Sequence, residues 1–209
     1  MANLFIVSAP SGTGKTSLIK ELIKDLDNII TSTSHTTREP RDGEIDGKDY
    51  FFVSKKKFTN LIKDNYFLEY ATVFDNSYGT SKIFIKENLN KNLDIIIDID
   101  WQGARQVKAN YPEAISIFIL PPSKKDLEYR LKSRNKDDDE VIIKRMKKAT
   151  TEMSHFNEYD FIIINDSFDA AVQDFKSIIV ANRLSLKQQL KNKPIFDKLG
   201  LKNGKISAK

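Results

Sequence analysis

A glycine-rich segment at residues 9–16 constrains the fold of this chain more than any other stretch. It reads Ala-Pro-Ser-Gly-Thr-Gly-Lys-Thr and follows a short apolar run at residues 4–7. After it, apolar residues recur at three- and four-residue spacing over residues 18–26, which predicts a helix. A strand, a glycine-rich turn and a helix that opens on Gly-Lys-Thr are typical of a phosphate-binding loop, or P-loop.

The residue types in this segment suit phosphate binding. Gly12 and Gly14 can adopt backbone conformations that direct several N–H groups into one concavity. The positive end of the helix dipole adds to this attraction. Lys15 can reach the outer phosphates, and the Thr16 hydroxyl can bind Mg²⁺. The usual pattern begins with Gly where this chain has Ala9, which needs a negative φ. The alternative is a turn with a surface lysine, but the flanking strand and helix disfavour it.

Composition narrows the class of protein. The chain has 209 residues, 40% of them hydrophobic and 30% charged, which predicts a globular protein. It contains no cysteine, so disulfides and thiolate metal sites are excluded. The apolar run near the N-terminus is too short for a signal peptide or a membrane span. We therefore expect a cytoplasmic protein without a membrane partner.

The net charge of +5 is spread along the chain rather than gathered in one basic block. No basic segment carries the aromatic residues typical of RNA-recognition modules. We therefore expect a polyanionic small ligand and no nucleic acid. The arginines fall mainly into two clusters, Arg38 with Arg41, and Arg130 with Arg134 and Arg145. Arginine is a planar, bidentate donor, so these clusters favour phosphate binding over ordinary surface positions.

The segment between residues 34 and 82 is predicted to be a small insertion. A β-branched run at 29–34 predicts the second strand of the main sheet. The loop that follows is marked by Pro40 and Gly43. A short strand at 50–53 and strands at 67–74 and 78–80, the last two joined by a tight turn, indicate a largely antiparallel sheet.

The pattern of alternating helices and strands resumes with a helix at 83–93 and an apolar strand at 94–99. Asp98 and Asp100 end this strand, and alternation along a strand places them on the same side. Ligands bind at the carboxyl ends of parallel strands, so both carboxylates are candidate functional groups. The alternative is that they cap the next helix.

Two basic helices come next along the chain. A helix at 105–110 and a strand at 114–120 precede a capping box formed by Ser123 and Asp126. The following helices carry Arg130 and Arg134, then Arg145, on either side of an acidic turn, and together they suggest a mobile lid. One stripe of the second helix is expected in the core: Ile142, Met146, Ala149 and Met153.

The chain then returns to the main sheet. A final strand at 161–164 ends at Asn165, and a long helix follows. Its inward face is expected to hold Phe168, Ala171, Val172, Phe175, Ile178 and Ile179. Beyond residue 191 the chain is basic with little periodicity, which predicts a loosely held tail.

Four segments together resemble the bacterial guanylate kinases: residues 8–16, 34–41, 78–81 and 98–103. The second reads Ser-His-Thr-Thr-Arg-Glu-Pro-Arg and is far more specific than the P-loop alone. The resemblance spans residues 1–190 in the order of the family, whose bacterial members share the alanine at position 9. It implies an α/β P-loop nucleoside monophosphate kinase fold with a parallel five-stranded core sheet flanked by helices, a small mixed-sheet insertion and a helical lid.

The resemblance also implies a division of the chain. The core would comprise residues 1–33, 83–125 and 150–190. The GMP-binding insertion would span 34–82 and the lid 126–149, and the basic tail would span 191–209. The implied activity is Mg²⁺-dependent transfer of the γ-phosphoryl group of ATP to GMP in purine nucleotide metabolism. Self-association into a homo-oligomer is compatible with the sequence.

Carried over by position, the resemblance assigns three groups of site residues, with Mg²⁺ held by Thr16 and, through water, by Asp98. ATP would be bound by Ala9, Pro10, Ser11, Gly12, Thr13, Gly14, Lys15, Thr16, Ser17 and Asn165. GMP would be bound by Ser34, Arg38, Arg41, Tyr50, Glu69, Tyr78, Gly79, Thr80 and Asp100. The residues acting on the transferred group would be Lys15, Arg38, Arg130, Arg134 and Arg145.

Two alternatives stay open at this point. The first is a catalytically inactive guanylate-kinase-like binding module, although such modules lack the intact phosphate loop that Lys15 and Thr16 complete here. The second is another nucleoside monophosphate kinase or a P-loop GTPase. A GTPase would not need the loop that carries Arg38 and Arg41.

Overall fold

The computed structural model of the chain describes residues 2–73, 75–134, 139–190, 193–202 and 205–206. Its centre is a five-stranded parallel sheet with the strand order β2-β7-β1-β8-β9. The central strand β1 pairs with β7 through Leu4 and Ile95, and with β8 through Phe5 and Ile115. The five strands are β1 (Leu4–Ser8), β2 (Ile29–Thr31), β7 (Asp94–Asp98), β8 (Ile115–Leu120) and β9 (Phe161–Ile164).

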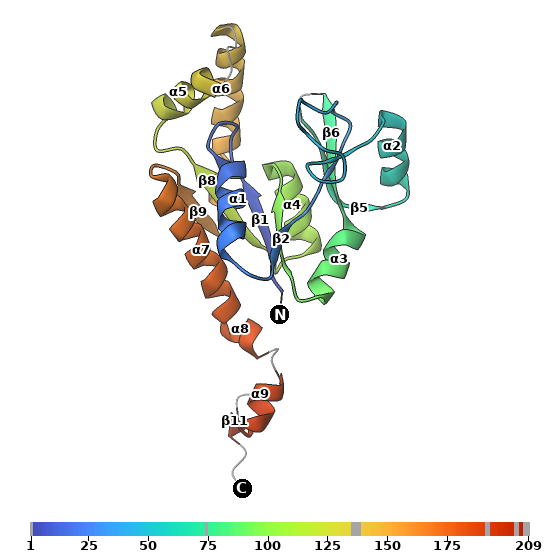
Figure 1. Cartoon of the computed structure of the whole chain (residues 1–209), viewed down its shortest axis with the longest axis vertical. Coiled ribbons are helices and arrows are strands. Elements are labelled where there is room, and N and C mark those ends of the chain that lie inside the picture. The colour runs from blue at the N-terminus through green and yellow to red at the C-terminus, as the bar shows by residue number, and fades with distance from the viewer. Residues whose placement is uncertain (1, 74, 135–138, 191–192, 203–204, 207–209) are drawn as a thin grey trace.

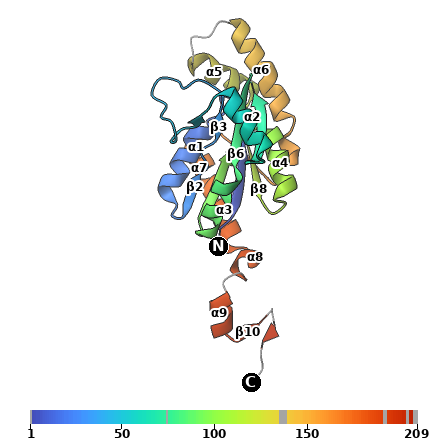
Figure 2. The ribbon, with the colours of Figure 1, turned by 90° about the vertical axis from the view of Figure 1, so that its right-hand side faces the viewer.

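Helices cover both faces of this sheet, as Figure 2 shows. Phe5 and Val7 point to the face covered by α1 (Lys15–Asp25) and α7 (Phe168–Leu184). Leu4 and Ile6 point to the other face, covered by α3 (Lys82–Asn90) and α4 (Trp101–Asn110). Burial on both faces explains why these strands are continuous apolar runs. The expected α/β architecture is confirmed.

A second, four-stranded sheet with the order β4-β3-β6-β5 lies beside the core (Figure 1). Its β3–β4 pair is parallel and its other pairs are antiparallel, so the sheet is mixed. Its β5–β6 hairpin agrees with the tight turn expected from the sequence. The elements are β3 (His35–Thr36), β4 (Phe51–Phe52), β5 (Phe67–Val73) and β6 (Asn76–Ser81), with α2 (Lys55–Lys63) beside them.

Helices α5 (Lys124–Arg134) and α6 (Asp139–Met153) stand on the opposite side from the small sheet in Figure 1. They pack through Leu127 and Leu131 of α5 and three residues of the expected stripe of α6: Met146, Met153 and Ala149, the last of which is 1% exposed. The Ser123 hydroxyl accepts a 3.0 Å hydrogen bond from the Asp126 N–H, as a capping box requires. The acidic turn lies largely outside the described residues.

Two expectations, one about the end of a strand and one about a buried side chain, were wrong. Strand β2 ends at Thr31 rather than at residue 34, because the chain leaves the core sheet there and His35 already belongs to the small sheet. Phe168, expected inside, is 40% exposed because it opens α7 at the rim of the sheet.

The basic tail contains regular structure where little was expected. Past α8 (Leu186–Gln189), the chain forms α9 (Lys193–Lys198) and a hairpin of β10 (Leu201–Lys202) and β11 (Lys205–Ile206). In Figures 1 and 2 these elements extend away from the core sheet. None of the helices in the described part of the chain is long and apolar enough to cross a membrane.

Candidate active site

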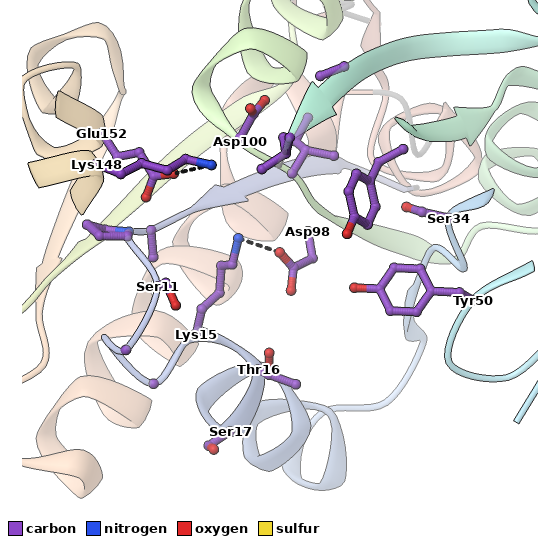
Figure 3. Close-up of a pocket in the computed structure, with 18 of the residues that line it drawn as sticks. Ser11, Lys15, Thr16, Ser17, Ser34, Tyr50, Asp98, Asp100, Lys148 and Glu152 are labelled. Carbon is purple, nitrogen blue, oxygen red and sulfur yellow. Dashed lines mark ion pairs between the residues drawn. The ribbon is translucent and has the colours of Figure 1, made fainter. Parts of the chain in front are cut away.

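A cavity of about 340 Å³ opens at the carboxyl ends of β1 and β7, between the P-loop, the small sheet and α6. Figure 3 shows Lys148 and Glu152 on one side of it and Ser34 and Tyr50 on the other. From the P-loop and α1, the lining residues are Ala9, Pro10, Ser11, Gly12, Gly14, Lys15, Thr16 and Ser17. From the rest of the chain, they are Ser34, Arg41, Tyr50, Glu69, Ala71, Val73, Tyr78, Asp98, Ile99, Asp100, Lys148 and Glu152.

The P-loop adopts the backbone conformation that its glycines permit. Gly12 and Gly14 have φ values of 93° and 94°, in the left-handed region that favours glycine. Ala9 is not among the described residues with positive φ other than glycine. Its side chain therefore introduces no backbone strain at the first position of the motif.

Two predicted ATP-site residues support the loop rather than line the cavity. The Thr13 hydroxyl donates a 2.9 Å hydrogen bond to the Pro10 carbonyl, and the Asn165 amide donates one of 2.6 Å to the Thr13 carbonyl. Both side chains are buried. A methyl group on Gly14 would lie 2.7 Å from the Asn165 amide nitrogen. Asn165 therefore fixes the loop from behind.

Lys15 and Asp98 point toward each other across the base of the cavity and form an ion pair (Figure 3). Thr16 lines the cavity beside them. The structure thus brings together an ammonium group, a carboxylate and a hydroxyl at the start of α1. Within the residues that the structure describes, no group of three or more His, Cys, Asp or Glu side chains could hold a metal ion by itself.

Helix α6 contacts the P-loop directly. A guanidinium nitrogen of Arg145 lies 3.1 Å from the Ser11 hydroxyl. Arg130 of α5 instead donates a 2.9 Å hydrogen bond to the Asn165 carbonyl, so it lies behind the loop. The backbone of Arg134 ends α5, and its side chain lies outside the described residues. Of the two predicted lid arginines whose side chains the structure describes, Arg145 therefore reaches the P-loop from the cavity side and Arg130 does not.

The sequence reasoning missed two charged residues of α6 that line the cavity, Lys148 and Glu152. They form an ion pair of 3.8 Å, and the Glu152 side chain is 16% exposed. Burial raises the pKa of the Glu152 carboxyl, while Lys148 and Lys15 lower it. The signal was present in the spacing, because residues three and seven positions after Arg145 share its helix face.

The side of the cavity formed by the small sheet holds Glu69, which is 2% exposed. The Thr80 hydroxyl donates a 2.6 Å hydrogen bond to its Oε1. Burial raises the pKa of the Glu69 carboxyl to about 7, and the nearby Asp100 contributes to that rise. Thr80 is fully buried and, like Gly79, is not among the lining residues; it orients Glu69 instead.

Asp100 lines the cavity and also caps α4. Its Oδ1 accepts hydrogen bonds of 3.0 Å from the N–H groups of Gln102 and Gly103. The alternative that Asp100 caps the next helix is therefore confirmed. Asp100 nevertheless also lines the cavity, so the two roles are compatible. Ser34 lines the same wall and is 9% exposed.

Arg38 lies beside the cavity in contact with Glu44. Its Nη2 donates hydrogen bonds of 2.8 and 2.9 Å to the two carboxylate oxygens. This pairing lowers the pKa of Glu44 and raises that of Arg38. The guanidinium carbon lies 5.3 Å from the centre of the Tyr50 ring, and Tyr78 lies 6.0 Å from Tyr50, centre to centre.

These groups give the cavity two different ends. The end formed by the P-loop presents a lysine, a hydroxyl and backbone N–H groups, which suits a polyphosphate. The other end presents a buried carboxylate beside hydroxyl and tyrosine groups, with Arg41 at its margin. Such an end suits a base with adjacent N–H donors that carries its own phosphate.

Comparison with known proteins agrees with this geometry. The guanylate kinase family model matches residues 1–182. The chain is 56% identical over 188 residues to the guanylate kinase of Shewanella denitrificans, covering 90% of this chain and 91% of that protein. It is 55% identical over 192 residues to that of Buchnera aphidicola from Acyrthosiphon pisum, covering 91% and 92%.

Among solved structures, the chain resembles the guanylate kinase of Anaplasma phagocytophilum, with a TM-score of 0.79 and 29% identity. The match covers 97% of both chains.

Proposed function

This chain belongs to the guanylate kinase family, and we propose that it transfers the γ-phosphoryl group of ATP to GMP in the cavity described above. The observation that carries the proposal is that one cavity is lined at one end by Lys15 of the P-loop and at the other by the buried carboxylate of Glu69. Two nucleotides can therefore meet with their phosphates between these ends.

The P-loop end would hold ATP. Backbone N–H groups of the loop and the dipole of α1 would bind the β- and γ-phosphates. Lys15 would leave Asp98 and pair with the transferring group, and Arg145, already at Ser11, would add positive charge. Arg130 and Arg134 would join through the movement of α5. The positive charges of these side chains would compensate the negative charge that spreads over the transferred phosphoryl group.

The opposite end would hold GMP. Guanine has adjacent N–H donors on its Watson–Crick edge, and Glu69 would accept both while Ser34 donates to O6. Adenine presents an acceptor where guanine presents a donor, so it would leave the carboxylate unpaired. A site built from buried polar groups rejects such a ligand strongly. Arg38, Arg41, Tyr50 and Tyr78 would hold the phosphate of GMP.

The donor atoms near Lys15 fit a magnesium ion bound with ATP. The Thr16 hydroxyl and the Asp98 carboxylate supply oxygen, and Mg²⁺ in nucleotide sites takes only one or two protein ligands besides phosphate and water. When bound, the ion would draw electron density from the β- and γ-phosphate oxygens. Thr16 would bind it directly and Asp98 through water.

The reaction needs no general base in this cavity, because the attacking oxygen of GMP belongs to a phosphate that is already an anion at neutral pH. What the chain supplies is alignment of the two phosphates and compensation of their charge. Closure of α5 and α6 would also exclude water, which competes with GMP as the acceptor. Direct transfer to GMP is therefore favoured over hydrolysis of ATP.

A coupled assay of ADP formation with GMP, AMP, UMP and dTMP as acceptors tests this function. We expect rapid turnover with GMP and at most about a hundredth of that rate with the other acceptors. An inactive binding module would give no ADP above background with any acceptor. A kinase for another nucleotide would rank the acceptors differently.

A further inference from the structure

Trp101 lies outside the set of residues that hold the two nucleotides, yet it makes an extensive contact beside the cavity. It is the only tryptophan of the chain and occupies the first turn of α4. The His155 ring stacks on it, with the ring centres 3.9 Å apart and an angle of 14° between the planes. The guanidinium carbon of Arg105 lies 4.6 Å from the centre of the Trp101 ring.

A carboxylate holds this aromatic pair together. Glu158 accepts hydrogen bonds from Arg105 Nε at 2.7 Å and Nη2 at 2.6 Å, and its Oε1 lies 2.7 Å from His155 Nδ1. The contact with Arg105 lowers the pKa of Glu158 to about 2. Because this carboxylate stays ionised at physiological pH, it keeps both partners oriented against Trp101.

The stack connects two walls of the cavity. Asp100, next to Trp101 in the chain, caps α4 and faces the guanine end of the cavity. Glu152, three residues before His155, lies in the last turn of α6 and faces the P-loop end. Asp100 and Glu152 are close enough for the charge of Asp100 to raise the pKa of Glu152.

From this arrangement we propose that Trp101 and His155 are positioning residues that couple the binding of GMP to the closure of α6 over ATP. The proposal rests on the proposed function. When GMP binds at Asp100, it holds the start of α4 in place. Because His155 stacks on Trp101, the end of α6 is then held in place as well. Helix α6 then stays where Arg145 and Lys148 face the P-loop.

Such coupling has a thermodynamic consequence that a purely structural contact does not have. If the Trp101–His155 stack links the two nucleotide sites, GMP and ATP each tighten the binding of the other, and linkage requires the factor to be the same in both directions. A contact that only stabilises the fold would change the melting temperature and leave this factor alone. The factor is therefore the quantity to measure.

The experiment is isothermal titration of GMP into the full-length protein, with and without saturating β,γ-methylene ATP and Mg²⁺. The ratio of the two dissociation constants is the coupling factor, and we expect about 10 or more for the unaltered protein. The substitution His155→Asn removes the ring and keeps a donor for Glu158. It should reduce the factor to below about 2 while GMP alone binds within about threefold of normal.

Two further variants separate stacking from stability. His155→Phe keeps a ring and loses the polar contact, so it should retain at least half of the coupling factor. Lys108→Ala removes a comparable tie between α4 and the chain before β9, a 2.6 Å ion pair with Asp160. It is the matched control and should leave the factor unchanged.

Two results would overturn the inference. A His155→Asn protein with a coupling factor within twofold of normal overturns the inference. So does an unaltered protein that binds both nucleotides without any coupling. An unaltered protein that binds no GMP would instead contradict the proposed function. If His155→Asn fails to fold, Trp101→Leu removes the stack from its other side and should also lower the coupling factor to below about 2. A factor within twofold of normal in that variant overturns the inference.

Discussion

The carboxylate of Glu69 lies so close to Gly103 that a methyl group added to this glycine would come within 2.5 Å of Glu69 Oε2. Gly103 is also held by Asp100, which accepts its N–H at 3.0 Å. The first turn of α4 thus lies directly against Glu69, the carboxylate that we assign to guanine, and is capped by Asp100, which lines the same cavity. Gly103 allows this close approach because it has no Cβ.

Gly103→Ala should impair the use of GMP without harming the fold. The new methyl group must displace Glu69, and the guanine N–H groups then lose their acceptor, which costs about 1–3 kcal/mol. We expect the KM for GMP to rise about 10- to 100-fold, with the KM for ATP within about twofold of normal as the internal control. Steady-state kinetics with each substrate varied in turn measures both values. An unchanged KM for GMP would show that Glu69 does not read the base.

The binding of guanine should weaken as the pH falls below 7. Burial raises the pKa of Glu69 to about 7, and only the ionised carboxylate accepts both N–H groups. At pH 6 about a tenth of the carboxyl groups are ionised, so binding should be about tenfold weaker than at pH 8.

Guanosine is the ligand for this pH measurement because it carries no phosphate to titrate. An NMR titration of the protein at both pH values gives the dissociation constants. Glu69→Gln should bind guanosine weakly and equally at the two pH values. If the unaltered protein binds guanosine equally well at pH 6 and pH 8, this role of Glu69 is wrong.

Lys15→Ala should lower the turnover number by about 10²- to 10³-fold or more, because the transferring group loses its nearest ammonium. The melting temperature should change little, since Lys15 contacts Asp98 in the cavity and not the core. Lys20→Ala, on the exposed side of the same helix, is the matched control and should behave normally. Near-normal turnover in the Lys15 variant would show that Lys15 does not assist phosphoryl transfer.

Stability should depend on an ion pair at the opposite end of the core sheet. Arg183 Nε lies 2.7 Å from Asp94 Oδ2, and the Asp94 side chain is 3% exposed. Arg183→Met would leave that carboxylate buried without its cation, at a cost of about 3 kcal/mol. For a chain of this size the melting temperature should fall by about 6–12 °C.

The control for this stability measurement is Lys187→Met. Lys187 pairs with Glu113 at 2.5 Å, but both side chains are more than half exposed. Such pairs contribute about 0–1 kcal/mol, so calorimetry should show a small shift. Equal effects of the two substitutions would contradict the argument from burial.

The core of the fold could be predicted from the sequence because its strands are buried on both faces. A run such as residues 95–97, three isoleucines, leaves little alternative to a central strand. The break between β2 and β3 could not be predicted in this way. Residues 29–36 are uniformly rich in β-branched side chains, so composition does not reveal where the chain passes from one sheet to the other.

The P-loop could be predicted for a related reason: its residues are contiguous, and its backbone geometry follows from glycine. Lys148 and Glu152 could not be found with the same ease, because they reach the cavity only through the packing of α6 on α5 and the P-loop. The ion pair between Arg38 and Glu44 could not be predicted either, because it depends on how one loop folds. A carboxylate six residues away in a loop has no fixed direction until the loop is folded.

If the cavity aligns ATP and GMP for direct transfer, the γ-phosphoryl group passes from one nucleotide to the other without release into water. This can be followed with ATP carrying ³²P at the γ position, with equal concentrations of GMP and AMP present. We predict that the label appears in GDP, with little in inorganic phosphate or ADP derived from AMP. Label released mainly as inorganic phosphate, or transferred equally to both nucleotides, would contradict the account.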